Sequence, residues 1–372
     1  FWDPSTLCRG NEMISPFADE EYQPSDPYYY TDAISNQAAR FIRENPSGEP
    51  FFLYVAYTAA HWPLHARQRD IARYKGKYDA GYDPIRKARL KKMKELGIVS
   101  NEADLSAVAG DWDSVKHKDW EAANMEVYAA MVDHMDQAVG RIVGALKRTK
   151  QFENTLIVYF HDNGACPEHL GGNGWNTANN ILAKARKEGK TVAVGDKYDV
   201  PMGGPLTYGS VGHNWACAQN TPMRRYKMNV HNGGACTPAI MHWPAGLKTK
   251  AGSITEQRGH VIDMMATCAE LAGAELPEEF NGKTIDTLES LSLVPIMKGK
   301  TTSRDHAYLF NHANTHAIVK GDYKIVREGG KRPWALYNLA RNRTETIDLA
   351  AKQPEVVTKL AEIWEARWGK KK

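Results

Sequence analysis

Two oxygen-bearing side chains, Asp162 and Asn163, stand directly after an apolar run in the middle of the sequence. The run, at residues 155–160, is rich in β-branched and aromatic residues and does not alternate, which is typical of a central strand covered on both faces. A carboxylate beside an amide is a pair of hard oxygen ligands suited to Ca²⁺ or Mg²⁺. Followed by Gly164, the same pair also suits a plain turn, so both interpretations stay open from these residues alone.

Two further residues, His61 and Lys227, stand in loops that follow apolar segments. His61 comes after a second continuous apolar run at residues 51–57, and Lys227 closes a short segment that also holds Arg224 and Arg225. A cation held by oxygen ligands, together with a lysine and a histidine, makes a site for a tetrahedral oxyanion. The cation and the ammonium neutralise the anion, and the histidine donates to an ester or leaving oxygen. Taken singly, each residue is more often a solvated lysine or a histidine that hydrogen-bonds within its loop.

This site is incomplete in the sequence. Cys8 has neither a base nearby in sequence nor a strand before it, so it is not a convincing nucleophile. Ca²⁺ takes about six to eight oxygen ligands, and the pattern identifies two of them, Asp162 and Asn163.

The elements that must position these residues follow the order of an α/β fold. Buried strands at residues 51–57 and 155–160 are each preceded by an amphipathic helix, which favours a parallel sheet of βαβ units. The first helix is expected to begin near Thr31 as its N-cap, and the second covers residues 119–148. Further elements are expected at residues 85–96 (helix), 180–188 (helix), 191–194 (strand), 238–243 (strand) and 261–271 (helix).

Past residue 300 the pattern changes to short apolar runs separated by turns, which predict an antiparallel meander followed by a helix. The strands are expected at residues 307–310, 316–319, 323–326 and 334–337, and the helix at residues 354–368. We therefore predict an α/β fold with a mixed, largely parallel sheet between helices. The predicted domains are residues 1–299 and a small antiparallel subdomain at residues 300–372.

Composition excludes several classes of protein. The chain has 372 residues, 42% of them hydrophobic, and a net charge of +4 spread over interspersed acids and bases, which gives no case for nucleic-acid binding. No apolar run approaches the ~20 residues of a membrane span. The five cysteines form no C-x-x-C pair and indicate neither a zinc site nor a disulfide framework. The chain carries no signal peptide and starts with Phe1, which suggests a fragment or a processed product.

The order of motifs resembles the type I sulfatases of the alkaline-phosphatase-like superfamily, most of all the bacterial arylsulfatase group. The resemblance covers nearly the whole chain. The matching segments are residues 29–33, 52–64, 128–136, 160–164, 220–227, 231–234, 238–244 and 336–345.

This resemblance implies a role for each candidate residue. Asp162 and Asn163 match the second pair of Ca²⁺ ligands, His61 the histidine that contacts the sulfate ester, and Lys227 the lysine that binds a sulfate oxygen. The family's nucleophile is a formylglycine made in a C/S-x-P/A-S/A-R motif, and an Asp-Asp pair completes its metal site. Neither is present here, so we expect an N-terminally truncated catalytic domain with an incomplete Ca²⁺ site that is inactive alone. The resemblance also implies a periplasmic or secreted location.

Two departures and two alternatives remain. The family's Glu-Gly-Gly is Asn232-Gly-Gly here, and the residue before Asp162 is His161 in place of a small one. The chain could instead derive from a phosphate or phosphonate ester hydrolase of the same superfamily, or be a non-catalytic module that binds sulfated glycans through Arg224, Arg225 and Lys227. The expected partner is a sulfated small molecule or glycan, and the oligomeric state stays open.

The substrate cleft is expected in the loops at residues 66–118 and 165–220, since function tends to sit on loops held by a rigid scaffold. Four aromatic residues could stack on a sugar or aryl ring there or be ordinary packing residues: Trp62, Trp175, Tyr208 and Trp215.

Overall fold

The computed structural model describes residues 1–2, 4, 7–15, 21–23, 28–46, 48–107, 110–170, 185, 187–285, 290–302 and 306–369. The chain forms two compact units. The first contains Phe1–Arg89, Ala107–Phe152 and Ala165–Thr221, and the second contains Leu90–Ser106, Glu153–Gly164 and Pro222–Lys372.

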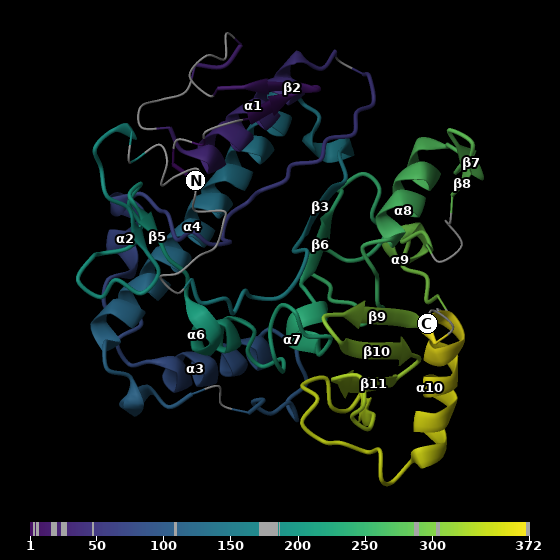
Figure 1. Ribbon diagram of the computed structural model, residues 1–372. Coiled ribbons are helices and arrows are strands. Elements are labelled where there is room, and N and C mark those ends of the chain that lie inside the picture. Colours follow the sequence, from purple (N-terminus) through teal and green to yellow (C-terminus); the bar gives the residue numbers. More distant parts are fainter. Residues whose placement is uncertain are drawn as a thin grey trace. The chain divides into compact units, whose positions relative to one another are not determined.

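The first unit is built on two long helices, α1 (Tyr30–Glu44) and α4 (Lys118–Arg148), which lie side by side (Figure 1). Each buries one stripe of small and apolar side chains spaced three or four residues apart, such as Ala38 and Ile42 on α1. Both helices were predicted from this spacing. Helix α1 begins one residue before Thr31, which is buried inside its first turn, because Tyr29 takes the N-cap position.

The main core of the first unit surrounds Trp215, which is fully buried. Tyr82 and Trp112 meet its ring edge-on, with centroids 4.7 and 5.7 Å away. Trp215 lies on helix α6 (Gly212–Gln219), in a stretch for which the sequence predicted no element. This aromatic therefore serves packing.

Residues 51–57, expected as a buried strand, are extended but belong to no strand ladder among the described residues. Phe52 is 79% exposed and Tyr54 is 74% exposed. Apolar, aromatic composition favours an extended backbone, but a ladder also requires a neighbouring strand, which the described residues do not provide.

In the second unit, β3 (Ile157–Phe160) pairs with β6 (Ala239–His242) in antiparallel register, with Phe160 opposite Ala239. Both strands were expected. The expectation of a largely parallel sheet differs from these ladders: among the described residues the parallel ladder joins β4 (Ala193–Val194) to β5 (Thr207–Tyr208) in the first unit.

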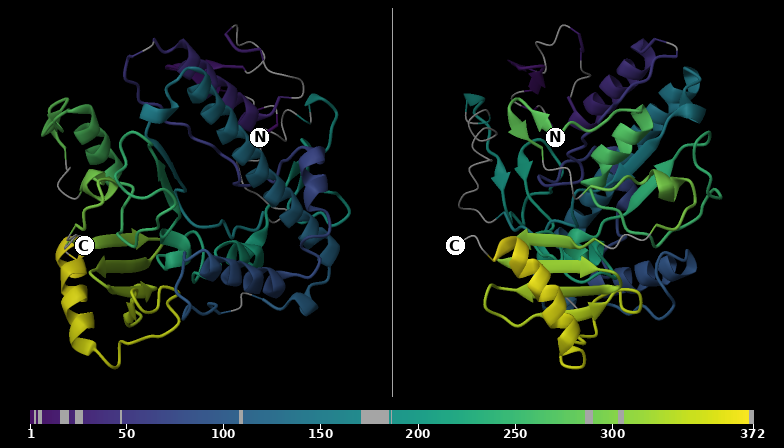
Figure 2. Two further views of the ribbon diagram at one scale, coloured as in Figure 1. Left: turned by 180° about the vertical axis from the view of Figure 1, so that it is seen from behind. Right: turned by 90° about the vertical axis from the view of Figure 1, so that its right-hand side faces the viewer.

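The C-terminal meander was predicted correctly. Strands β9 (Tyr308–His312), β10 (Thr315–Lys320), β11 (Tyr323–Glu328) and β12 (Ala335–Asn338) form one antiparallel sheet in the order β12-β11-β10-β9. Helix α10 (Pro354–Trp368) packs against β10 and β11, and Figure 2 shows it along the sheet in both views. Its residues Leu360 and Trp364 are buried in that contact. The predicted boundary at residue 300 remains a prediction.

The remaining elements are short or lie on surface segments: β1 (Leu7–Arg9), β2 (Glu12–Ile14), α2 (Gln68–Ile71), α3 (Tyr82–Glu95), α7 (Asn232–Ala235), α8 (Asp263–Ala272), β7 (Glu279–Phe280), β8 (Lys283–Thr284) and α9 (Val294–Met297). The helix expected at residues 180–188 falls mostly outside the described residues. Within the described ranges, no helix combines the length and hydropathy needed to cross a membrane.

Candidate functional site

Asp162 and Asn163 form a turn directly after strand β3, as the sequence predicted. Oδ1 of Asp162 accepts from the Asn163 backbone N–H at 3.0 Å and from Asn163 Nδ2 at 3.2 Å. Asn163 Nδ2 also donates to the carbonyl of Gly164 at 3.2 Å. These bonds involve Oδ1 of Asp162 and the two nitrogens of Asn163, not Asp162 Oδ2 or Asn163 Oδ1. A carboxylate and an amide oxygen so arranged fit Ca²⁺, which takes oxygen ligands of both kinds.

The turn is fixed by hydrogen bonds on both sides to the segment that contains the short helix α7. The Gly164 N–H donates to the carbonyl of Gly234 at 3.0 Å. On the other side, Thr237 Oγ1 donates to the carbonyl of His161 at 2.8 Å. The position of the Asp162–Asn163 turn therefore depends on the backbone of the segment that carries α7.

The loop of Lys227 folds around two glycines of α7, Gly233 and Gly234. The Gly233 N–H donates to the carbonyl of Arg224 at 2.8 Å. A Cβ atom on Gly233 would lie 2.1 Å from the Arg225 carbonyl oxygen, and one on Gly234 would lie 2.0 Å from that of Asn229. Only glycine permits this approach.

Lys227 itself is half-buried and lies between two residues with left-handed backbone, Arg225 (φ 67°) and Met228 (φ 72°). Residues other than glycine adopt this backbone conformation at a cost in free energy, and such residues are often found at functional sites. The bidentate ion pair from Arg225 to Glu328, at 2.9 and 3.1 Å, helps to hold the loop in this shape.

A buried charged network supports α7 from the C-terminal meander. Glu345 is fully buried and pairs with Lys324 at 2.8 Å and with His231 at 3.2 Å. Burial would raise the pKa of Glu345, but the Lys324 ammonium and the His231 imidazole outweigh it and lower that pKa to about 2. A hydrogen bond from His231, assisted by Arg225, also lowers the pKa of Glu328 to about 2.

Asn232 is tied into this network by three hydrogen bonds. Its backbone N–H donates to Glu345 Oε2 at 2.7 Å, and its Oδ1 accepts from Lys324 Nζ at 2.8 Å. Its Nδ2 donates to the carbonyl of Arg343 at 2.9 Å. Asn232, which replaces the family's Glu, therefore has a structural role: it anchors the start of α7. No motif indicates its partners, which lie about a hundred residues further along the chain.

His161, the other departure, is exposed and contacts the strand rather than the turn. Its Nε2 lies 2.7 Å from the hydroxyl of Tyr159, two residues earlier on β3. Burial of part of the ring lowers the pKa of His161, and the neighbouring Asp162 carboxylate opposes that shift.

His61 lies in the first unit, in the loop after the extended residues 51–57. Its Nδ1 lies 3.0 Å from the carbonyl oxygen of Trp62. Trp62 in turn donates from Nε1 to Glu168 Oε2, and its ring contacts Tyr208 at a centroid distance of 5.9 Å. Trp62 and Tyr208 thus pack against each other, and Trp175 lies outside the described residues.

Asp162, Asn163 and Lys227 are therefore joined within one unit through the backbone of α7. Whether His61 acts with them stays a prediction, as do the four site assignments.

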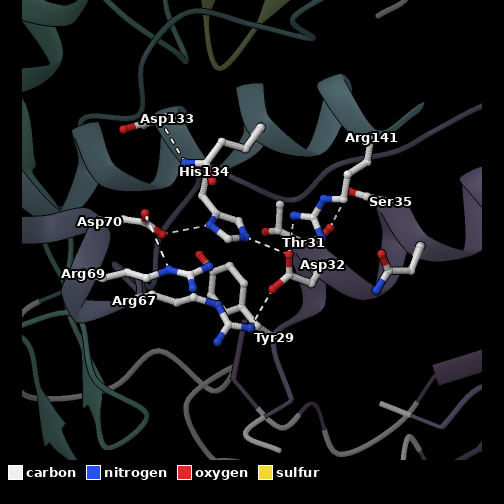
Figure 3. A network of polar contacts seen from close by, with 12 residues as sticks. Tyr29, Thr31, Asp32, Ser35, Arg67, Arg69, Asp70, Asp133, His134 and Arg141 are labelled. Atoms are coloured by element: carbon white, nitrogen blue, oxygen red, sulfur yellow. Dashed lines mark hydrogen bonds and ion pairs between the residues drawn. The ribbon is translucent and has the colours of Figure 1, made fainter. Parts of the chain in front are cut away.

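A second polar network, which the sequence did not indicate, lies between α1 and α4 in the first unit (Figure 3). His134, 1% exposed, is held between two carboxylates: its Nε2 lies 2.8 Å from Asp32 Oδ1 and its Nδ1 lies 2.9 Å from Asp70 Oδ2. Asp32 also accepts from Arg67 at 2.6 Å and from Arg141. Burial would raise the pKa of Asp32, but its hydrogen bonds hold that pKa well below its ordinary value. Figure 3 shows these side chains converging from α1, α4, α2 and Arg67, the residue before α2.

Comparisons with known proteins agree with these motifs. An uncharacterised sulfatase of Schizosaccharomyces pombe is 29% identical over 95% of this chain and 64% of its own length. The arylsulfatase of Klebsiella aerogenes is 29% identical over 75% of this chain and 58% of its own length. A solved structure of Ps i-CgsB in complex with k-i-k-neocarrahexaose has a TM-score of 0.59 and 23% identity, covering 94% of this chain and 57% of that one.

The chain thus spans between 57% and 64% of the length of these proteins. The structural likeness confirms the alkaline-phosphatase-like fold. The sulfatase family model matches residues 2–274, which is most of the chain. This chain therefore belongs to the sulfatase family.

Proposed function

We propose that the chain carries part of the active site of a Ca²⁺-dependent sulfate-ester hydrolase. The observation that supports this most is the attachment of two elements to one backbone segment. The turn of Asp162 and Asn163 bonds to Gly234, and the loop of Lys227 folds around Gly233 and Gly234. Two oxygen ligands and an ammonium group are thereby held by the same short helix.

In this proposal Asp162 and Asn163 hold the cation, which when bound offsets the negative charge of the sulfate oxygens. Lys227 binds a sulfate oxygen and orients the ester. Both groups act on charge that is spread over the anion, so their effect depends on fixed positions. The left-handed residues on both sides of Lys227 support such a fixed position.

His61 is proposed as the donor to the leaving ester oxygen. The carbonyl of Trp62 favours a proton on His61 Nδ1, at 3.0 Å. The proton for the leaving oxygen then comes from Nε2 of the doubly protonated ring. This assignment rests on the match between residues 61–64 and the family motif.

The nucleophile belongs to a sequence motif that these 372 residues do not contain. We therefore expect the purified chain to hydrolyse no 4-nitrophenyl sulfate, with or without Ca²⁺. Measurable turnover by this chain would contradict the need for a formylglycine outside it.

The decisive experiment uses the product of the whole reading frame that encodes this chain, assayed with 4-nitrophenyl sulfate, 4-nitrophenyl phosphate and a phosphonate monoester. We expect the sulfate ester to have the highest kcat/KM, with activity lost on adding a chelator. Preference for the phosphate or phosphonate ester would support the other hydrolase class. Chelator-insensitive binding of a sulfated glycan without turnover of any ester would support a binding module.

The expected substrate is a sulfated small molecule or a sulfated glycan, and a periplasmic or secreted location would suit such substrates. The likeness to an arylsulfatase is consistent with an aryl sulfate as the first probe.

A further inference from the structure

We propose that His61, Cys166 and Glu168 form a binding site for a thiophilic divalent cation such as Zn²⁺. One ligand atom from each residue lies within 4.8 Å of the others. All three residues belong to the first unit and are half-buried. This binding does not depend on the proposed hydrolysis, because it uses a different set of ligand atoms from the oxygen pair of Asp162 and Asn163.

The spacing of the atoms is close to that of a tetrahedral site. Cys166 Sγ donates to Glu168 Oε2 at 3.0 Å. In a tetrahedral zinc site, with Zn–S of about 2.3 Å and Zn–O of about 2.1 Å, sulfur and oxygen lie about 3.6 Å apart. The bound cation replaces the thiol proton, which passes to solvent as Cys166 becomes a thiolate. Small side-chain movements are therefore sufficient to admit the ion.

Neighbouring groups already orient two of the ligands. A proton on His61 Nδ1 donates to the Trp62 carbonyl at 3.0 Å, which makes Nε2 the ligand nitrogen. Trp62 Nε1 donates to the Glu168 carboxylate. The backbone carbonyl of Glu168 accepts from Ser210 Oγ at 2.6 Å. Metal-ligating histidines and carboxylates are commonly fixed by such outer hydrogen bonds, and losing one weakens metal affinity by about 10- to 100-fold.

The chemistry of the ligand set selects the metal. A thiolate and an imidazole suit Zn²⁺ and similar ions, whereas Ca²⁺ and Mg²⁺ require oxygen ligands. Three protein ligands leave the fourth position of a tetrahedral ion open, as in sites that exchange a water or a small anion. If the proposed function is right, the cation binds the same His61 nitrogen that donates to the leaving oxygen. We then expect Zn²⁺ to inhibit sulfate-ester hydrolysis.

The test is a titration of the purified chain with Co²⁺, which reports cysteine ligation through its thiolate-to-metal charge-transfer absorption. We expect this absorption to appear, to disappear when Zn²⁺ is added, and to be missing from Cys166→Ser. Cys236→Ser is the matched control, since Cys236 is an exposed thiol outside the cluster and its removal should leave the absorption unchanged.

Zn²⁺ affinity is then measured by competition with a chromophoric chelator. We expect Cys166→Ser to weaken it by at least about 100-fold and Glu168→Gln, which keeps an acceptor for Trp62, by at least about 10-fold. Circular dichroism is used to check that each variant is folded. If Cys166→Ser does not fold, the Zn²⁺ affinity of Glu168→Gln tests the proposal instead. No charge-transfer absorption in the unaltered chain, or equal Zn²⁺ affinity in the folded variants, would overturn the proposal.

Discussion

Asp32 offers the clearest test of what holds helices α1 and α4 together. Its Oδ1 accepts from His134 and Arg141, and its Oδ2 accepts from Arg67. The Asp32→Asn change keeps the shape of the side chain but removes the negative charge on which these three donors converge. It therefore isolates the charge of the network from its packing.

The expected loss follows from the geometry. An asparagine can place its oxygen at only one of the two positions, so its NH₂ group meets the donors at the other. Removing one partner of a buried ion pair costs about 3–5 kcal/mol. Because Asp32 is 13% exposed and keeps one acceptor as asparagine, the lower end applies. We expect Asp32→Asn to lower the free energy of unfolding by about 3 kcal/mol.

The assay is urea unfolding at neutral pH, followed by circular dichroism and tryptophan fluorescence. If unfolding occurs in two transitions, the urea midpoint should shift in the transition that unfolds the first unit. Hydrogen exchange of the amides of α1 and α4 identifies that transition. Asp136→Asn is the control, because Asp136 is exposed on helix α4 of the same unit and its loss of charge should change stability by less than about 0.5 kcal/mol. A loss below about 1 kcal/mol for Asp32→Asn would refute the view that this network stabilises the unit.

Four further predictions concern the second unit and the proposed site. Gly234→Ala brings a Cβ atom to 2.0 Å from the Asn229 carbonyl oxygen, so we expect it to weaken Ca²⁺ binding, measured by calorimetry. Gly140→Ala, at an exposed position of helix α4 where a Cβ atom meets nothing within 4 Å, should leave binding unchanged. Glu345 and Glu328 have pKa values lowered from 4.5 to about 2, so both stabilise the fold above about pH 4.5 and lose that contribution as pH falls toward 2. The urea midpoint of the second unit should fall over this range, and Glu345→Gln should lower it at neutral pH and flatten its pH dependence. A slope unchanged by Glu345→Gln would count against the assignment. In the product of the whole reading frame, Lys227→Ala should reduce kcat/KM for an aryl sulfate by about 10²- to 10³-fold, as expected for one electrostatic contact to a developing charge. Arg341→Ala is the control, because Arg341 is an exposed cation of the same unit, and it should leave kcat/KM unchanged. Asp162→Asn should weaken Ca²⁺ binding in calorimetry, and unchanged affinity would show that the ion, if bound, lies elsewhere.

Local patterns were enough to predict many of the regular elements, although not α6. Helix α10 occupies residues 354–368 as its apolar spacing indicated, and the four strands of the meander lie where short apolar runs are separated by turns. Residues 51–57 show the limit of this reasoning. Their composition favours an extended backbone, but whether a ladder forms depends on a neighbouring strand that the segment itself does not encode.

The candidate site likewise contains residues that the local sequence predicts and residues that it does not. The turn of Asp162 and Asn163 follows from three consecutive residues, so it was predictable. The network of His134 was not predicted, because its partner Asp32 lies 102 residues away in sequence. Likewise, Cys166 and Glu168 carry no motif, and they join His61 only through the tertiary structure. Contacts between residues that lie far apart in sequence become visible only in the tertiary structure.

The anchoring of α7 by the meander has a consequence for the order in which this chain is made. Asn232 leaves the ribosome 113 residues before Glu345, counting from 345 back to 232, and Glu345 is the carboxylate that receives its N–H. At about 5–20 residues per second, synthesis of that interval takes roughly 6–23 seconds. During this time the loop of Lys227 lacks the support that fixes α7. The segment proposed to bind the anion thus gains this support only after Glu345 has been synthesised, and a chain interrupted before Glu345 would contain the proposed site residues without the carboxylate that anchors α7.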